Sequence, residues 1–206
     1  MDGMEAGNRH VLVGRKQVLH TLRLAVDDAV AGRGGLTLLS GEPGVGKTRL
    51  AEEICGYVRS REVTVAWGSC WEGEGAPGFW PWLQILRVVA PGGERGDLPG
   101  DVGSATAEPG GTLPGKSAVR RVPAPLVEVG QERFRLFDTI TGLLRTACRS
   151  RPLVAVLDDL HWSDAPSLRL LRFLARNLGT LPMLVLGTYR DVEMGQTIHS
   201  PKCWVS

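Results

Sequence analysis

The chain has 206 residues, 43% of them hydrophobic, so it is long enough to bury the core of one α/β domain. Lys and Arg total 24 against 22 Asp and Glu, and the resulting net charge of +2 gives no reason to expect direct binding to DNA or another polyanion. The four cysteines are scattered without a CxxC pair, which argues against a disulfide framework and against a zinc site.

The N-terminus lacks the features of a targeting signal. Residues 1–10 contain charges and glycine where a secretory signal needs an apolar core, and no later run approaches the ~20 apolar residues of a membrane span. We therefore expect residues 1–10 to be flexible, and the protein to be cytoplasmic without a membrane partner.

The first elements predict a βαβ unit around a glycine-rich loop. Apolar residues recur at helical spacing over residues 15–31, and the short apolar run at residues 36–40 is typical of a buried parallel strand. A second helical pattern covers residues 47–60, and residues 63–67 predict the next strand.

The middle of the chain changes composition. Residues 71–82 are rich in aromatic side chains and lead into a short helix that we expect to end near residue 90. Between residues 91 and 130, Gly, Pro, Ser and Ala dominate, which predicts an extended, disordered loop within the domain. Residues 131–149 then repeat apolar side chains along one face of a helix.

The last elements complete an α/β pattern. Residues 153–157 predict a third strand, residues 165–178 a helix capped by Ser163 or Asp164, and residues 183–188 a fourth strand. Alternating strands and helices predict a three-layer α/β fold with a mostly parallel sheet. We expect this core to cover residues 11–194, and residues 195–206 to form an irregular tail.

The strongest motif lies between the first predicted strand and the second predicted helix. It satisfies the pattern G-x-x-x-x-G-K-[ST] with the residues Gly41, Glu42, Pro43, Gly44, Val45, Gly46, Lys47 and Thr48. The glycines let backbone N–H groups wrap the phosphate oxygens of ATP, Lys47 reaches the β- and γ-phosphates, and Thr48 offers a hydroxyl to Mg²⁺. An accidental glycine turn is the alternative, and the position between a strand and a helix argues against it.

Two carboxylates follow the third predicted strand, at the end where open α/β sheets bind their ligands. This is the Walker B arrangement, in which Asp158 is predicted to hold Mg²⁺ and Asp159 to polarise the attacking water. A helix cap or a solvated turn is the ordinary alternative for such a pair. For Asp159 the catalytic role and the ordinary alternative have equal weight.

Three further features have two interpretations each. Arg190, just beyond the fourth predicted strand, either contacts the γ-phosphate or pairs on the surface with an acidic neighbour. His161 and Trp162 either line the site or, more ordinarily, pack under the next helix. The aromatic cluster over residues 67–82 could stack nucleic-acid bases, but few basic residues interleave with it, which favours packing.

With these residues, the chain resembles the ATPase module of the STAND class within the AAA+ superfamily of P-loop NTPases, as found in large LuxR-type transcriptional regulators and related bacterial signalling proteins. The matching segments occur in the family's order: VGR at residues 13–15, the octet at 41–48, CWEGEGAP at 70–77, LDDLHWSD at 157–164 and GTYRD at 187–191. The resemblance implies that Gly14 and Arg15 lie near the adenine, and that Arg190 belongs to the sensor strand.

The C-terminus departs from the family pattern. The family continues with a fifth strand, a helical lid and a winged helix, and residues 195–206 do not resemble this continuation. We therefore expect a truncated or frameshifted product with an incomplete sheet. In the family's strand order, the strand at residues 36–40 would then be an unpaired, apolar edge, which invites aggregation.

The resemblance implies a regulatory switch that is set by ATP or ADP and reset by slow hydrolysis of MgATP. The alternative is a nucleotide-binding or interaction module without useful hydrolysis. A protein partner and self-association both stay open. Direct DNA binding is not expected, because the sequence indicates neither a helix-turn-helix nor a basic surface.

Overall fold

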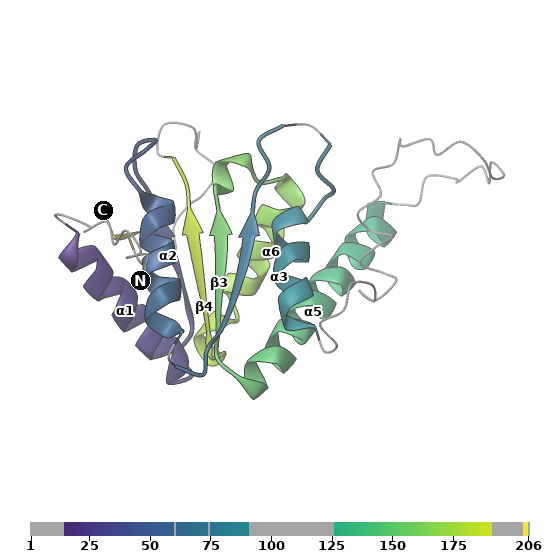
Figure 1. The fold of residues 1–206 in the computed structure, drawn as a ribbon. Coiled ribbons are helices and arrows are strands. Elements are labelled where there is room, and N and C mark those ends of the chain that lie inside the picture. The colour runs from purple at the N-terminus through teal and green to yellow at the C-terminus, as the bar shows by residue number, and fades with distance from the viewer. Residues whose placement is uncertain (1–14, 60, 74, 91–125, 191–203, 206) are drawn as a thin grey trace, which may run out of the picture.

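The computed structural model describes residues 15–59, 61–73, 75–90, 126–190 and 204–205. A β-sheet lies between two layers of helices (Figure 1). The strands are β1 (Gly35–Leu39), β2 (Thr64–Ser69), β3 (Leu153–Asp158), β4 (Met183–Thr188) and β5 (Trp204–Val205). The helices are α1 (Lys16–Val30), α2 (Lys47–Val58), α3 (Trp80–Val89), α5 (Leu126–Ser150), α6 (Ala165–Ala175) and the short 3₁₀ segments η1 (Leu160–Trp162) and η2 (Leu178–Thr180).

The sheet has the strand order β2-β3-β4-β1-β5, and all neighbouring strands are parallel. The carboxyl ends of the strands therefore share one edge of the sheet, which is the upper edge in Figure 1. β1, which precedes the glycine-rich octet, lies between β4 and β5.

β3 and β4 are buried along their whole lengths because helices cover both faces of the sheet. In β3, Leu153, Ala155 and Leu157 pack in the core shared with α3, α5 and α6. The alternate residues Val154 and Val156 pack in the core shared with α1 and α2. Successive side chains of a strand point to opposite faces, so a continuous apolar run fits this doubly covered position. The three-layer fold predicted from such runs is confirmed.

Two helix boundaries differ from the prediction. Most of the loop expected over residues 91–130 lies outside the described residues, but α5 already begins at Leu126 and runs through Gly130. A helix tolerates such a glycine at a penalty of about 1 kcal/mol. α6 ends at Ala175 instead of residue 178, where the backbone tightens into η2. Leu178 fits the apolar pattern because it is buried, not because it is part of the helix.

The expected unpaired edge at β1 was wrong. β1 pairs in parallel with β5, through Leu38 with Trp204 and Leu39 with Val205. These two residues of β5 belong to the segment that we expected to be irregular, and the rest of that segment lies outside the described residues, as do residues 1–14. A two-residue strand has no periodicity of its own, so only its pairing reveals it.

Candidate functional site

The glycine-rich octet forms the loop between β1 and α2, at the carboxyl edge of the sheet (Figure 1). Gly41, Gly44 and Gly46 have φ angles of 150°, 74° and 86°, which residues with a side chain rarely adopt. The N–H of Val45 donates to the carbonyl of Glu42 over 3.3 Å and closes a turn within the loop. Helix α2 begins directly after Gly46, so its unpaired N–H groups and positive dipole end face the loop.

Lys47 is the first residue of α2 and is only 8% exposed. Its Nζ donates to the carbonyl oxygens of Gly41 at 2.8 Å and Glu42 at 3.0 Å. A buried ammonium group needs such acceptors because its desolvation is otherwise unfavourable. The side chain therefore curls back over the loop and places its charge beside the glycines.

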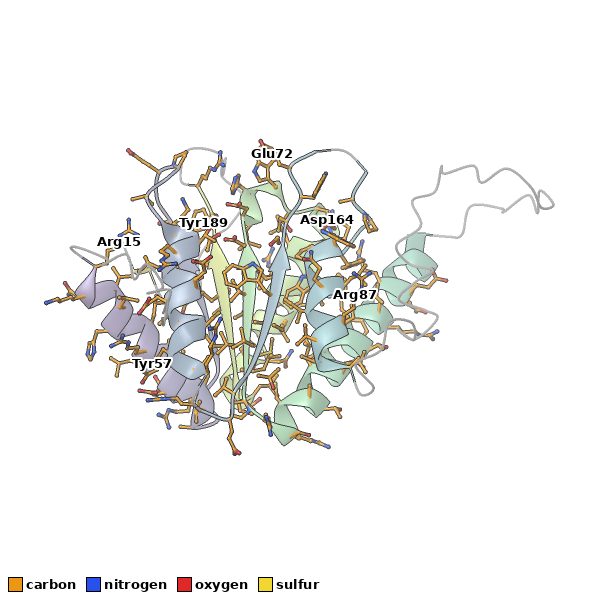
Figure 2. The ribbon with its side chains drawn as sticks, viewed as in Figure 1. Arg15, Tyr57, Glu72, Arg87, Asp164 and Tyr189 are labelled. Carbon is orange, nitrogen blue, oxygen red and sulfur yellow. The ribbon has the colours of Figure 1, made fainter. Side chains whose placement is uncertain are left out.

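Arg15 immediately precedes α1 and also reaches the loop; Figure 2 labels it at that end of the helix. Its Nη1 donates to the carbonyl oxygen of Gly46 at 3.0 Å. A β-carbon on Gly46 would lie 2.8 Å from the same nitrogen, but this is the flexible end of Arg15, so the φ of 86° is what favours glycine here. Arg15 thus ties α1 to the junction between the loop and α2. Gly14, its neighbour in the motif, lies outside the described residues.

Asp158 ends β3 and is 8% exposed. Its Oδ1 accepts a hydrogen bond from Oγ1 of Thr48 at 3.2 Å and one from Oγ1 of Thr188 at 2.6 Å. Thr48 and Asp158 are 110 residues apart in the sequence. The fold therefore brings together the two side chains that the sequence assigned to Mg²⁺, and their role as ligands stays a prediction.

Thr188, the last residue of β4, is a site residue whose role the sequence argument missed. It is fully buried, and its hydroxyl donates to Asp158 while accepting from the backbone N–H of Asp159 at 2.9 Å. The only signal in the sequence is a polar residue that ends an apolar strand. The pairing of Leu157 with Gly187, one residue earlier in each strand, is what sets Thr188 beside the two carboxylates.

Asp159 has a left-handed backbone, with φ 58° and ψ 50°, which is uncommon for a residue other than glycine. Its side chain is 43% exposed, and Oδ1 lies 3.9 Å from Nδ1 of His161. The His161 side chain is buried, as the packing interpretation predicted, and its ring centroid lies 5.2 Å from that of Trp162. Trp162 itself is 36% exposed, so the packing interpretation does not hold for it. Asp159 is therefore open to water, whereas Asp158 is enclosed.

Arg190 follows β4 and is partly buried at the same edge of the sheet. The N–H of Tyr189 donates to the carbonyl of Leu39 at 3.0 Å, which fixes the backbone before Arg190 next to the start of the glycine loop. Figure 2 shows Tyr189 at this edge. The acidic residues that follow Arg190 lie outside the described residues, and its contact with the γ-phosphate stays a prediction.

Asp164 caps α6, which settles the choice between Ser163 and Asp164. Its carboxylate accepts from the N–H of Ser167 at 3.0 Å, from the Ser167 hydroxyl at 2.5 Å and from the N–H of Phe79 at 3.2 Å. The buried indole of Trp82 donates to the carbonyl of Ser167 at 3.1 Å. These bonds tie α3 to α6, so the packing interpretation of the aromatic cluster holds for Phe79 and Trp82.

Cys70 lies beside these acidic residues at the end of β2. The pKa of its thiol is raised to about 11, mainly by burial; a hydrogen bond with Ser163 opposes this shift, and the nearby carboxylates add to it. The thiol therefore stays protonated at neutral pH. Across the described part of the chain, no group of three or more His, Cys, Asp or Glu could hold a metal ion. A cation at Thr48 and Asp158 would need further oxygen ligands from phosphate and water.

The chain is similar in sequence to a curated protein. A curated relative, an uncharacterized protein of Rhizobium meliloti (strain 1021), is 27% identical over 192 residues. That match covers 87% of this chain, and the chain spans 18% of the relative's length. None of the described helices has the length and apolar character needed to cross a membrane.

Solved structures with the same fold include Cdc6p from Pyrobaculum aerophilum, with a TM-score of 0.51 and 17% identity over 88% of this chain and 40% of that chain. The ORC2 protein of Aeropyrum pernix, solved as ADPNP-ADP complexes, has a TM-score of 0.45 and 16% identity over 90% of this chain and 44% of that chain. The family described as AAA ATPase domain matches residues 11–186. Since this match covers most of the sequence, the chain belongs to the AAA ATPase domain family.

Proposed function

We propose that this chain binds MgATP at the glycine loop and hydrolyses it slowly, as a regulatory nucleotide switch in a signalling or transcription-regulator protein. The observation that carries the proposal is the hydrogen bond between Thr48 and Asp158, 3.2 Å long. It joins the phosphate-binding loop to the acidic end of β3, which is the pairing that a nucleotide-bound cation requires.

The residues of the loop fit a nucleotide in three ways. Backbone N–H groups at the start of α2 and in the glycine turns bind phosphate oxygens, and Lys47 exchanges its two carbonyl acceptors for the β- and γ-phosphates. Thr48 and Asp158 would hold Mg²⁺, because both offer the oxygen ligands that this cation prefers. Mg²⁺ neutralises the charge on the phosphates when it is bound.

For hydrolysis we assign Asp159 to the attacking water and Arg190 to the γ-phosphate. The carboxylate of Asp159 is 43% exposed, so water reaches it. The backbone N–H of Asp159 donates to the Thr188 hydroxyl, which holds Asp159 in its left-handed conformation. This conformation turns the chain away from the sheet, so the Asp159 carboxylate is separated from the enclosed Asp158. Strained backbone at such a position is typical of functional sites.

The regulatory role rests on the resemblance to STAND-class modules. Such a switch works when ATP and ADP stabilise two conformations to different degrees. The chain spans 18% of the length of its curated relative, so an attached output region and a protein partner or self-association are part of the proposal. We place this function in the cytoplasm.

Nucleotide binding is tested by thermal unfolding with MgATP, MgADP and MgGTP. Ligand at about 100 times its dissociation constant stabilises the fold by roughly 2.7 kcal/mol, which raises Tm by roughly 5–10 °C for a domain of this size. We expect Lys47→Ala to abolish the shift with ATP. Lys16→Ala removes the same charge from an exposed position on α1 and serves as the matched control. We expect this variant to keep the Tm shift with ATP. No shift in the wild-type protein would refute the proposal.

Hydrolysis is tested separately by phosphate release. We expect slow turnover in the wild-type protein, and loss of turnover with retained ATP binding in Asp159→Asn. If the wild-type protein binds ATP without releasing phosphate, it is a nucleotide-binding module and the hydrolytic part of the proposal fails.

A further inference from the structure

The two helical layers differ in how their charges are balanced. On the side of α1 and α2, acidic side chains neutralise neighbouring arginines. Three ion pairs lie there: Arg33–Asp28, Arg49–Glu52 and Arg61–Asp27. The net charge of +2 is a sum over the whole chain, so it does not show how charge is distributed between this helical layer and the layer of α5 and α6.

The other side carries an excess of arginine on α5 and α6. Between residues 135 and 149 of α5 and between residues 165 and 176 around α6, the only acidic residue is Asp138. The exposed arginines of these stretches are Arg135, Arg145, Arg149, Arg169, Arg172 and Arg176. Within the part of the chain that the structure describes, none of these arginines forms an ion pair. We call them the basic face.

Helical periodicity places these arginines on the outer surface. In α6 the three arginines follow at intervals of three and four residues, opposite the buried Leu170 and Leu174. In α5 they share a stripe that flanks the buried Leu144 and Cys148, with Arg145 nearest to the buried face. α5 and α6 contact each other and lie on the same side of the sheet (Figure 1). Because these arginines are exposed, both stripes face solvent.

The dimensions of the basic face suit a nucleic-acid backbone. At 1.5 Å per residue, the stripe on α5 is about 21 Å long and that on α6 about 10 Å. Packed helices lie about 8–10 Å apart. A duplex carries one phosphate charge per about 1.7 Å of its axis, so several phosphates fall within reach of arginines on two adjacent stripes.

We propose that the basic face binds the sugar–phosphate backbone of double-stranded nucleic acid, without reading base sequence. An acidic protein is less favoured because protein interfaces depend on several buried aromatic or aliphatic anchors. Among the described residues of α5 and α6, only Phe134 is an exposed large hydrophobic side chain, and its ring packs edge-to-face against that of Phe173. Backbone binding needs only cations, and guanidinium groups bind phosphate in two-point contacts. This proposal departs from the expectation based on net charge, and the proposed function is separate from that of the nucleotide site.

The test is fluorescence anisotropy of the full chain with two labelled 25-base-pair duplexes of unrelated sequence, over a salt series. We expect equal binding to both, with a log–log salt slope of about −4. Arg169→Ala/Arg172→Ala should weaken binding at least tenfold at 100 mM salt and reduce the slope by about 2. Arg23→Ala/Arg59→Ala removes the same charge from exposed positions on the α1–α2 side and should change the affinity less than twofold.

Three outcomes overturn the proposal. The first is that the chain does not bind either duplex at 50 mM salt, and the second is that the two double variants weaken binding equally. The third is that polyglutamate competes more strongly than unlabelled duplex at equal charge, which would identify an acidic protein as the partner. All four substituted positions are exposed, so the basic-face variant should unfold at the wild-type temperature. Arg23 lies 5.1 Å from the centroid of the Tyr57 ring, so the control variant should unfold slightly below that temperature. Lys47→Ala should bind the duplex as tightly as the wild-type protein does. Loss of nucleotide binding would therefore leave the proposed duplex binding intact, and the two proposals can fail independently.

Discussion

Replacing Thr188 with valine tests whether one buried hydroxyl holds the two carboxylates in place. Valine has nearly the shape of threonine but removes both hydrogen bonds of the hydroxyl. These are the donation to Asp158 at 2.6 Å and the acceptance from the N–H of Asp159 at 2.9 Å. The side chain is fully buried, so water cannot replace either bond without rearrangement.

The magnitude follows from the partners. A hydrogen bond to a charged group contributes about 1.5–3 kcal/mol, and leaving a buried amide unsatisfied costs about 1–3 kcal/mol. Thr48 still donates to Asp158 in the variant, which limits the loss. We expect Thr188→Val to lower the free energy of unfolding by about 3 kcal/mol. Thr188→Ser keeps the hydroxyl and loses one methyl group, so we expect a decrease of about 1 kcal/mol.

The assay is urea unfolding followed by circular dichroism without nucleotide, on wild type and both variants at constant pH. Equal m-values would show that the variants unfold from the same compact state. If Thr188→Val is as stable as Thr188→Ser, the hydroxyl does not support the carboxylates and the reasoning fails. The same variants should rank in the same order for MgATP binding, since Asp158 loses its buried donor only in the valine variant.

Three further predictions concern packing, capping and pH. A β-carbon on Gly34 would lie 2.3, 2.3 and 2.6 Å from three backbone carbonyl oxygens, whereas one on Gly35 meets nothing within 4 Å. In urea unfolding, Gly34→Ala should therefore lose at least about 3 kcal/mol and Gly35→Ala less than about 1 kcal/mol, and equal losses would contradict the packing. Asp164→Ala removes the cap of α6 and the acceptor for the N–H of Phe79, so we expect a loss of about 2 kcal/mol; a loss below 0.5 would exclude this role. Burial raises the pKa of the Cys148 thiol from 9.0 to about 11, so the unfolded chain releases this proton first and stability falls between pH 9 and 11 by on the order of 1 kcal/mol per pH unit. Cys148→Ser should reduce that fall in unfolding measured across this range, and an unchanged pH dependence would refute the assignment.

Much of this protein was predictable from short segments of its sequence. The glycine octet, the apolar run that ends in Asp158, and the helical stripes are local patterns, because each depends on residues within one or two turns or strands. Their order along the chain was enough to predict the three-layer fold. The same reasoning placed the start of α5 too late, because a helix can contain a glycine such as Gly130 that the sequence pattern assigned to the preceding loop.

Other features exist only because distant segments meet. Thr188 became a site residue because the parallel register of β3 and β4 sets it beside Asp158. Arg15 reaches Gly46 because α1 packs beside the glycine loop, and β1 gains a second partner from a strand of two residues.

Charge shows the same division between sequence and structure. Composition determined a net charge of +2, and no pattern within one segment indicated that arginines from α5 and α6 would share an outer surface. Periodicity assigns each side chain to a face of its own helix, but the packing of helices on the sheet decides which faces point outward together. Local patterns are determined by neighbouring residues, whereas hydrogen-bond partners and surfaces depend on the three-dimensional distances that packing creates.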